Sequence, residues 1–241
     1  MDVVLCIDIG NKNVKTGVFQ DNRLDHVFVG FPERKLVEEA KSIVLSSVSD
    51  SRLGEFLVLL RNWGMERKLL RLRASDQNFI KVNYEDPDKL GDDRIALAFY
   101  LMSYHSSAIG VDAGTFINVE YVRDRMHFPM VIFPGIHILK DCFKRGERLK
   151  NLEIPLVILN YQSRCDKFPQ TSEECMEYGL IFALRGIIKG VMDVTGCKNV
   201  VFTGGDGEIL RNLSGFGAYE ENAVILGLYE YYKLLSSRSI S

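Results

Sequence analysis

The segment VVLCIDIGNKNVKTGVF, residues 3–19, determines the fold that we predict for this chain. Its apolar start ends at Asp8 and Gly10, and mixed apolar and polar residues follow. This pattern is typical of a strand, a tight turn and a second strand. A glycine turn directly after a strand exposes backbone N–H groups to which a phosphate can bind. We therefore expect the Gly10–Asn11–Lys12 turn to supply donors to an anion.

The same layout returns at residues 106–122, SSAIGVDAGTFINVEYV. Aligning the two segments matches Asp8 to Asp112 and Gly10 to Gly114. One Asp-x-Gly turn is usually ordinary turn chemistry, but two at corresponding positions predict an internal duplication whose second copy begins near residue 107. Gly114 and Thr115 are then further phosphate donors. Asp8 and Asp112 are candidates to hold a divalent metal directly or through water.

The rest of the sequence alternates strand and helix patterns, which indicates an α/β protein. We expect a long connection over 74–91, which is rich in turn formers, and a capping box at Thr171 and Glu174. The further strands that we expect lie at 24–31, 55–60, 68–73, 131–135 and 199–203, and the helices lie at 33–48, 92–105, 136–152, 171–196 and 222–235.

Composition excludes several classes of protein. The chain has 241 residues, of which 46% are apolar and 26% charged, and this length suits one large domain or two small ones. No apolar run approaches the roughly 20 residues that span a bilayer, and the first residues lack the features of a signal peptide. We expect a cytoplasmic protein with no membrane partner.

The cysteines and the charge exclude further classes. Five cysteines, none in a C-x-x-C pair, predict reduced thiols rather than disulfides or a metal centre. A net charge of −2 predicts no nucleic-acid partner. We interpret the locally basic run at 61–73 as the solvated face of a helix or an edge strand.

Two more segments offer candidate chemistry. TGGD at 203–206 places a glycine turn after a strand, which suits close approach of a nucleotide, although such turns are often plain strand-to-helix connections. Asp93 is either an N-cap of the helix at 92–105 or a base that accepts the proton of an attacking alcohol. Arg94 either lies in solvent or binds a substrate carboxylate. Spacing does not choose between these alternatives.

The motifs in their order resemble one family, the type III pantothenate kinases, which belong to the acetate kinase, sugar kinase, Hsp70 and actin superfamily. The resemblance covers nearly the whole chain. The segments that carry it are IDIGNKNVKTGVF, LGDDRIALAFY, GVDAGTFINVEYV, FPGIHILKDCFKRGERL, TSEECMEYGLIFALRGII and VVFTGGDGEIL.

This resemblance implies an α/β fold of two ribonuclease-H-like lobes, an actin-like ATPase duplication, at 1–106 and 107–241, with a nucleotide cleft between them. It implies a homodimer and ATP-dependent phosphorylation of pantothenate to 4'-phosphopantothenate, the first step of coenzyme A biosynthesis. It also implies Mg²⁺ and a monovalent cation, K⁺ or NH₄⁺.

The resemblance also assigns site residues by position. Asp93 is the catalytic base in this assignment, and Asp8 and Asp112 are metal ligands. The residues expected to bind pantothenate are Tyr84, Gly91, Asp92, Arg94 and Thr171. The residues expected to bind ATP are Asp8, Gly10, Asn11, Lys12, Asn13, Lys15, Gly114, Thr115, Gly204 and Gly205.

Four departures from the family pattern keep a second hypothesis open. Lys12 stands where the family has threonine, Asp92 replaces a small alanine, residues 116–118 lack two hydroxyls, and residues 147–150 replace a Thr-Ala-x-Leu-Pro segment. The alternative is a divergent, catalytically weak or inactive member that binds nucleotide as an accessory or regulatory protein. A kinase for another small hydroxy acid is the third hypothesis.

Overall fold

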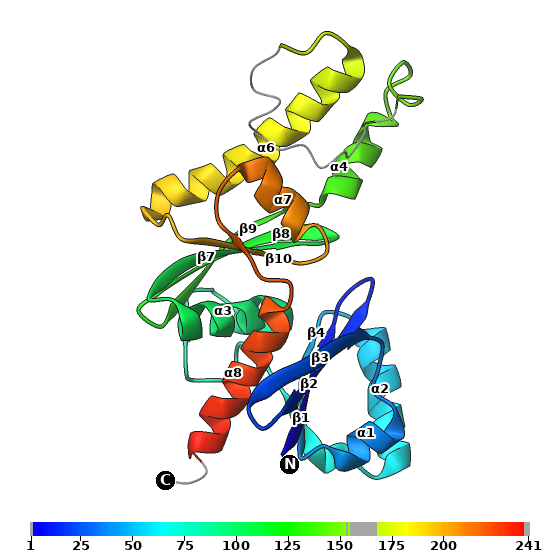
Figure 1. The fold of residues 1–241 in the computed structure, drawn as a ribbon, viewed down its shortest axis with the longest axis vertical. Coiled ribbons are helices and arrows are strands. Elements are labelled where there is room, and N and C mark those ends of the chain that lie inside the picture. Colours follow the sequence, from blue (N-terminus) through cyan, green and yellow to red (C-terminus); the bar gives the residue numbers. More distant parts are fainter. Residues whose placement is uncertain (1, 153, 155–167, 239–241) are drawn as a thin grey trace. The chain divides into compact units, whose positions relative to one another are not determined.

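The computed structural model describes residues 2–152, 154 and 168–238, and in that part the strands form two sheets (Figure 1). The first sheet consists of β1 (Val3–Ile9), β2 (Val14–Gln20), β3 (Arg23–Val29), β4 (Ser42–Ser47) and β5 (Leu69–Arg71), in the order β3-β2-β1-β4-β5. The second consists of β6 (Lys81–Val82), β7 (Ser107–Ala113), β8 (Phe116–Arg123), β9 (Met126–Pro134), β10 (Val200–Thr203) and β11 (Ala218–Tyr219), in the order β11-β10-β7-β8-β9-β6.

The two sheets repeat one topology. In the first, β1 lies between the β2–β3 hairpin and β4, with which it pairs in parallel. In the second, β7 lies between the β8–β9 hairpin and β10, again paired in parallel. Asp8 and Asp112 occupy the same place in this pattern, near the end of the central strand. The predicted two-lobed α/β architecture is confirmed in this strand order.

The helices are α1 (Arg34–Glu39), α2 (Asp50–Trp63), α3 (Asp92–Tyr104), α4 (Ile136–Phe143), α6 (Ser172–Thr195), α7 (Gly207–Ser214) and α8 (Ala223–Arg238), with short 3₁₀ turns at Glu66–Lys68 and Pro87–Lys89. No described helix has the length and apolar character needed to cross a membrane. At α6 the expected cap is present, because the Thr171 hydroxyl accepts the Glu174 N–H.

Three expected elements were wrong. The helix predicted over 33–48 ends at Glu39, and Ser42–Ser47 forms β4, because β-branched residues there pair with β1 in the buried centre of the sheet. The strand predicted at 55–60 lies inside α2, whose buried residues Leu53, Phe56 and Leu60 follow helical spacing. The helix predicted over 136–152 ends at Phe143, and turns follow.

The described residues group into two compact units. Those of 1–106, 122–129 and 222–241 form the first, and those of 107–121 and 130–221 form the second. Helix α8 belongs to the first unit, although it comes last in the chain. The predicted division at 106/107 concerns the two copies of the duplicated pattern and stays a prediction.

The first unit buries its sheet on both faces. Helices α1 and α2 lie on one face (Figure 1). There Val37 and Phe56 pack with strand residues such as Leu5 in a continuous apolar core. On the other face, α3 and α8 pack against each other and against the central strands. Gly227 lies where α8 packs tightly on α3, because a Cβ there would overlap the Ala96 carbonyl. Burial on both faces explains why β1 and the middle of β4, residues 43–45, are mostly apolar.

We predict that Gly227→Ala destabilises the protein. An added Cβ would lie 3.1 Å from the Tyr100 nitrogen and closer still to the Ala96 carbonyl, so the two helices would have to separate. Overpacking of this kind costs about 1–3 kcal/mol, which thermal unfolding measures. Gly190→Ala is the control, because nothing lies within 4 Å of that added Cβ. An alanine there should stabilise α6 by up to ~1 kcal/mol. Equal melting temperatures for the two variants would contradict the prediction.

Candidate active site

The turn at residues 10–13 carries exposed side chains, and a side chain of α2 contacts its backbone. The Gly10 N–H donates to the Asn13 carbonyl at 3.0 Å, which closes the turn. The Arg52 guanidinium, on α2, donates to the Gly10 carbonyl at 3.1 Å. The side chains of Asn11, Lys12 and Asn13 are exposed. An anion can therefore approach this turn while α2 keeps its backbone in place.

Asp8 lies at the foot of this turn. It is opposite Lys15 in the β1–β2 register and opposite Ser46 in the β1–β4 register. The Ser46 hydroxyl donates to Asp8 Oδ1 at 2.8 Å. Burial raises the pKa of Asp8, and the nearby Asp92 carboxylate adds to this rise, whereas the Ser46 hydrogen bond and the Lys15 charge oppose it. Asp8 is thus a carboxylate whose charge the surrounding protein only partly compensates.

The predicted acceptor motif forms the N-terminus of α3. Gly91 is the N-cap, so the interpretation of Asp93 as the N-cap was wrong. Asp93 is the second helical residue, and its Oδ1 accepts the Arg94 N–H at 2.8 Å. A side chain at Gly91 would come within 2.6 Å of that oxygen. The absence of a side chain at Gly91 therefore leaves space for the Asp93 carboxylate at the N-terminus of α3.

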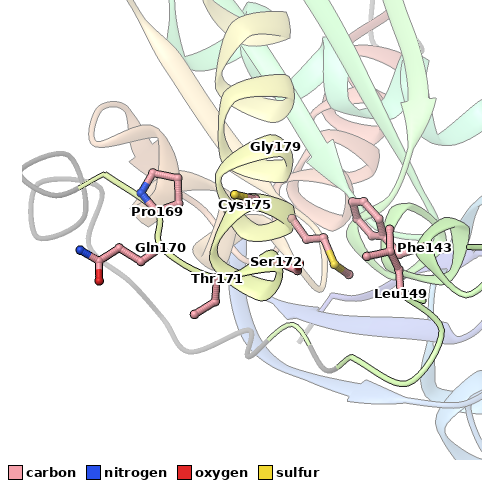
Figure 2. Close-up of a pocket in the computed structure, with 9 residues that line it drawn as sticks. Phe143, Leu149, Pro169, Gln170, Thr171, Ser172, Cys175 and Gly179 are labelled. Carbon is pink, nitrogen blue, oxygen red and sulfur yellow. The ribbon is translucent and has the colours of Figure 1, made fainter.

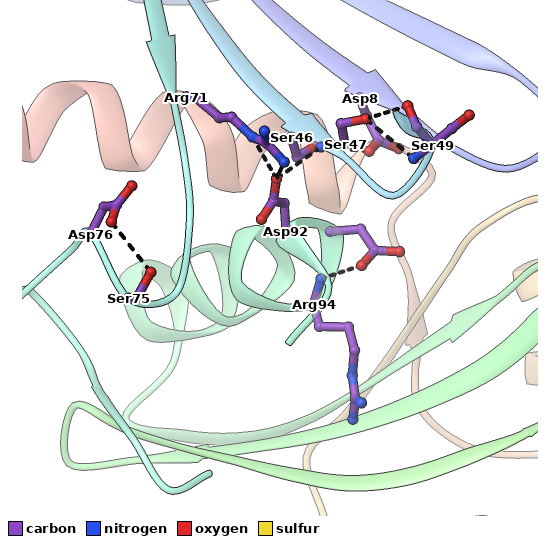
Figure 3. Close-up of polar contacts among 10 residues, drawn as sticks. Asp8, Ser46, Ser47, Ser49, Arg71, Ser75, Asp76, Asp92 and Arg94 are labelled. Atoms are coloured by element: carbon purple, nitrogen blue, oxygen red, sulfur yellow. Dashed lines mark hydrogen bonds and ion pairs between the residues drawn. The ribbon is translucent and has the colours of Figure 1, made fainter. Parts of the chain in front are cut away.

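Asp92 lies deeper than its neighbour. Its carboxylate accepts hydrogen bonds from Arg71 and from the Ser47 N–H, and the Arg94 side chain extends away from this group (Figure 3). Burial raises the pKa of Asp92, and the charge and hydrogen bonds of Arg71 oppose that rise. The interpretation of 61–73 as a solvated face was wrong at Arg71, because this side chain forms a largely buried ion pair.

In the second unit, the turn after β7 is packed closely against two other strand ends. The Gly135 N–H, directly after β9, donates to the Thr115 carbonyl at 3.0 Å, and the Asp206 N–H, after β10, donates to the Ala113 carbonyl at 2.9 Å. A Cβ at Gly135 would overlap the backbone of Gly114. The glycine at 135 is thus required by close approach of two backbones.

The backbone at Gly204 lies against the Asp112 carboxylate, beside the turn that follows β7. It adopts φ 86°, and a Cβ there would overlap the Asp112 carboxylate. The N-termini of α4 and α7 begin at Gly135 and Asp206, and His137 lies 3.8 Å from Asp206. Backbone N–H groups at helix N-termini favour anions. The second unit therefore gathers the Asp112–Thr115 turn, the Gly204–Gly205 turn and two helix N-termini.

Two further predicted site residues, Thr171 and Tyr84, do not belong to the turns described above. Thr171 caps α6 and lines an apolar pocket of about 560 Å³, in which Phe143 and Leu149 face the first turns of α6 (Figure 2). None of the glycine turns lines this pocket. Tyr84 belongs to the connection before α3, and 41% of its surface is exposed.

The family comparison decides the affiliation of the chain. The model of a family described as type III pantothenate kinase matches residues 4–194. The chain belongs to the type III pantothenate kinase family. A type III pantothenate kinase of Brevibacillus brevis is 26% identical over 256 residues, 96% of this chain and 98% of that one. One of Campylobacter jejuni is 30% identical over 145 residues, 60% of this chain and 63% of that one.

Solved structures agree on the fold. A Campylobacter jejuni protein named for the Baf family of transcriptional activators is 25% identical, with a TM-score of 0.65 over 97% of this chain and 99% of that one. An activator of 2-hydroxyisocaproyl-CoA dehydratase from Clostridium difficile, solved with bound ADPNP, has a TM-score of 0.56 at 11% identity, over 99% of this chain and 98% of that one. At 11% identity the likeness concerns the fold alone.

Sequence reasoning missed several residues of this pantothenate kinase family site. Arg52 and Ser46 support the first turn and Asp8, Arg71 holds Asp92, and Gly135 packs on the second turn. Only Gly135 left a signal, because a Pro-Gly pair ended an expected strand. The other three sit on elements whose neighbours in space are distant in sequence, so no spacing pattern identifies them.

The described residues are compatible with a magnesium ion whose ligands come mainly from the phosphate oxygens of a bound nucleotide. Among them, no group of three or more His, Cys, Asp or Glu side chains is placed to hold a metal. Mg²⁺ in kinases commonly takes one or two carboxylates together with phosphate oxygens and waters. At Asp8, Ser46 donates to Oδ1, and no hydrogen bond to Oδ2 occurs in the described part of the chain. Asp8 is therefore suited to such an ion, which would also supply the positive charge that the carboxylate lacks.

We predict that Asp8→Asn stabilises the protein in the absence of metal and nucleotide. The raised pKa of Asp8 means that folding disfavours its charged form, so its contribution to stability falls as pH rises from about 3.9 through the folded-state pKa. Asparagine removes the charge and keeps an oxygen for the Ser46 hydroxyl. The melting temperature at pH 7 should rise by a few degrees, where 1 kcal/mol corresponds to about 2–4 °C.

The difference between Asp8→Asn and wild type should shrink as pH falls toward about 4, where the carboxylate protonates. Asp88→Asn, at an exposed aspartate, is the control and should show no such pH-dependent gain. A melting temperature of Asp8→Asn at pH 7 equal to or below that of wild type would contradict this account of Asp8.

Proposed function

We propose that this protein phosphorylates pantothenate with ATP to give 4'-phosphopantothenate, the first step of coenzyme A biosynthesis. Family membership supports the reaction class and the acceptor. The observation that carries the proposal is the N-terminus of α3, where Gly91 leaves space for the Asp93 carboxylate beside Arg94. A carboxylate held in this way is suited to accept a proton from a bound alcohol.

The phosphate-binding residues in this proposal are the two duplicated turns and the Gly204–Gly205 turn. The Gly10 and Gly114 N–H groups close their own turns, so the predicted donors are the other N–H groups of these turns. The Lys15 amine and the N-termini of α4 and α7 also favour negative charge. Lys12 adds an exposed cation to the first turn. Bound Mg²⁺ would neutralise developing charge on the phosphates. Asp8 and Asp112 are the residues proposed to hold it, with K⁺ or NH₄⁺ as a further cation.

Asp93 is the proposed catalytic base. Its carboxylate takes the proton of the pantothenate hydroxyl as that oxygen bonds to the γ-phosphorus, while the bond from this phosphorus to the β,γ-bridging oxygen breaks and ADP leaves. The hydrogen bond from the Arg94 N–H to Oδ1 helps to orient this carboxylate at the start of α3. Arg94 offers a planar guanidinium to the pantothenate carboxylate.

Further parts of the proposal rest on the resemblance. Tyr84 and Thr171 are proposed to complete the pantothenate pocket in a homodimer, and the protein is proposed to act in the cytoplasm. The two ribonuclease-H-like lobes are proposed to correspond to residues 1–106 and 107–241. The exposure of Tyr84 and the pocket beside Thr171 support only the assignment of these two residues, because both are accessible within their own units.

A regulatory protein that binds nucleotide is the second candidate. It is favoured by the similarity to the Campylobacter jejuni protein named for the Baf family of transcriptional activators. The replacement of threonine by Lys12 in the first motif and the loss of two hydroxyls over residues 116–118 in the second are also in its favour. A coupled assay with pantothenate, ATP, Mg²⁺ and K⁺ separates the candidates, because MgATP binding without turnover of pantothenate would exclude the pantothenate kinase and favour this one over it.

We predict that Asp93→Asn lowers kcat for pantothenate phosphorylation by about 10²–10⁴-fold, the usual contribution of a general base. The asparagine oxygen can still accept the Arg94 N–H, so the fold of the helix end should persist. The melting temperature and the KM for MgATP should therefore stay close to wild type. Steady-state kinetics and thermal unfolding measure both effects.

The matched control is Asp21→Asn, in the β2–β3 turn, where the backbone has φ 47°, a conformation that asparagine also tolerates. It should leave kcat within about two-fold of wild type, because surface changes away from special features have small effects. A kcat for Asp93→Asn as high as that of this control would move the base to another residue.

We predict that Lys12→Met raises the KM for MgATP by about tenfold and changes kcat little, because an exposed cation on the phosphate turn contributes binding shared by substrate and transition state. The effect should weaken at high ionic strength. Lys35→Met, at an exposed lysine on α1, is the control. A lower KM for Lys12→Met would instead mean that the lysine obstructs the nucleotide.

A further inference from the structure

An ion pair with a buried carboxylate joins the N-terminus of α3 to the edge of the first sheet (Figure 3). Arg71, the last residue of β5, donates from Nε and Nη2 to Asp92 Oδ2 at 3.1 and 3.0 Å. The same oxygen accepts the Ser47 N–H, at the end of β4, at 3.3 Å. The side chains of Arg71 and Asp92 are 28% and 8% exposed. A single carboxylate oxygen thus connects β4, β5 and α3.

We propose that Arg71 is a positioning residue for phosphoryl transfer, acting through Asp92 on the first turn of α3. This inference rests on the proposed kinase function. Asp92 is the first residue of α3, and the proposed base Asp93 and the proposed carboxylate ligand Arg94 follow it directly. An anchor at the first helical residue fixes where the next two side chains begin. Small displacements of catalytic groups are costly, because transfer requires near-contact geometry.

Arg71 also sets the charge in this region. The Asp92 carboxylate is close enough to Asp8 to raise its pKa, and Lys15 opposes that effect. Arg71 provides the main compensation for the Asp92 charge, and Arg73 contributes at longer range. Removing Arg71 alone would leave a buried, uncompensated anion beside the carboxylate proposed to bind metal.

The pair explains a departure from the family pattern. Where the resemblance places a small alanine, this chain has Asp92. Arg71, in the edge strand β5, forms an ion pair with it. With three hydrogen bonds to one oxygen and little exposed surface, Asp92 is suited to hold the helix rather than to bind substrate. The requirement for Arg71 then depends on Asp92, so removing both side chains should restore the simpler arrangement of the family.

A double-mutant cycle tests this dependence. Purified full-length Arg71→Met, Asp92→Ala and the double variant are compared with wild type in the coupled pantothenate assay, with Arg67→Met as the control at an exposed arginine. Breaking a buried pair is far more harmful than removing both partners. We expect Arg71→Met to lower kcat about 10–100-fold and to change the KM for MgATP less than about 3-fold, while the double variant regains a kcat within about 5-fold of wild type.

A purely structural role would lower the melting temperature of Arg71→Met and leave the kcat of the folded enzyme unchanged. That result, or a double variant no more active than Arg71→Met, would overturn the proposal. Arg71→Lys provides a variant less prone to unfold, because it keeps the charge and loses the planar two-nitrogen contact. It should lower kcat about 3–10-fold at a nearly unchanged melting temperature, and a wild-type kcat would likewise overturn the proposal.

Hydrogen exchange separates failure of this inference from failure of the proposed function. If wild type does not phosphorylate pantothenate, the proposed function fails. Exchange at the first-turn amides of α3 still tests Arg71. Faster exchange in Arg71→Met, reversed in the double variant, supports the anchoring role. Unchanged exchange overturns it.

Discussion

The parallel pairing of β1 with β4 is the constraint on which the first unit depends. It pairs Asp8 with Ser46 near the carboxyl ends of the two strands, and it places the Ser47 N–H within hydrogen-bond distance of the Asp92 carboxylate. Parallel strands require cover on both faces, and α1 and α2 on one side with α3 and α8 on the other provide it. The same cover brings the N-terminus of α3 to the carboxyl end of β4, so the packing of the core also assembles the candidate site.

Carboxylates dominate the candidate site in the first unit, and their burial opposes folding. Burial raises the pKa of both Asp8 and Asp92, and the protein compensates them unequally. Asp92 has Arg71, whereas Asp8 has one hydroxyl donor and the more distant charge of Lys15. A site that keeps one carboxylate under-compensated favours a cation brought with the substrate, and it accepts lower stability in the empty state.

The second unit reaches a similar chemistry through backbone rather than side-chain contacts. Gly135 and Gly204 let two strand ends approach the turn that follows β7, and main-chain hydrogen bonds to Thr115 and Ala113 hold it. Side chains in the turn have changed from the family pattern at Phe116, but the backbone donors do not depend on side-chain identity. These main-chain contacts of the turn can therefore persist where its side chains depart from the motif.

The sequence by itself determined the duplicated strand–turn–strand units, the α/β class, the helix that begins at Asp92 and the family, because these follow from local periodicity and from glycine positions. Tertiary structure alone decided that 42–47 is a central strand, because a short apolar run suits either a helix or a strand until its neighbours are known. It also decided that Arg71 pairs with Asp92, since 21 residues separate them in the chain. Local patterns encode conformation, whereas such pairs depend on which segments the fold brings together.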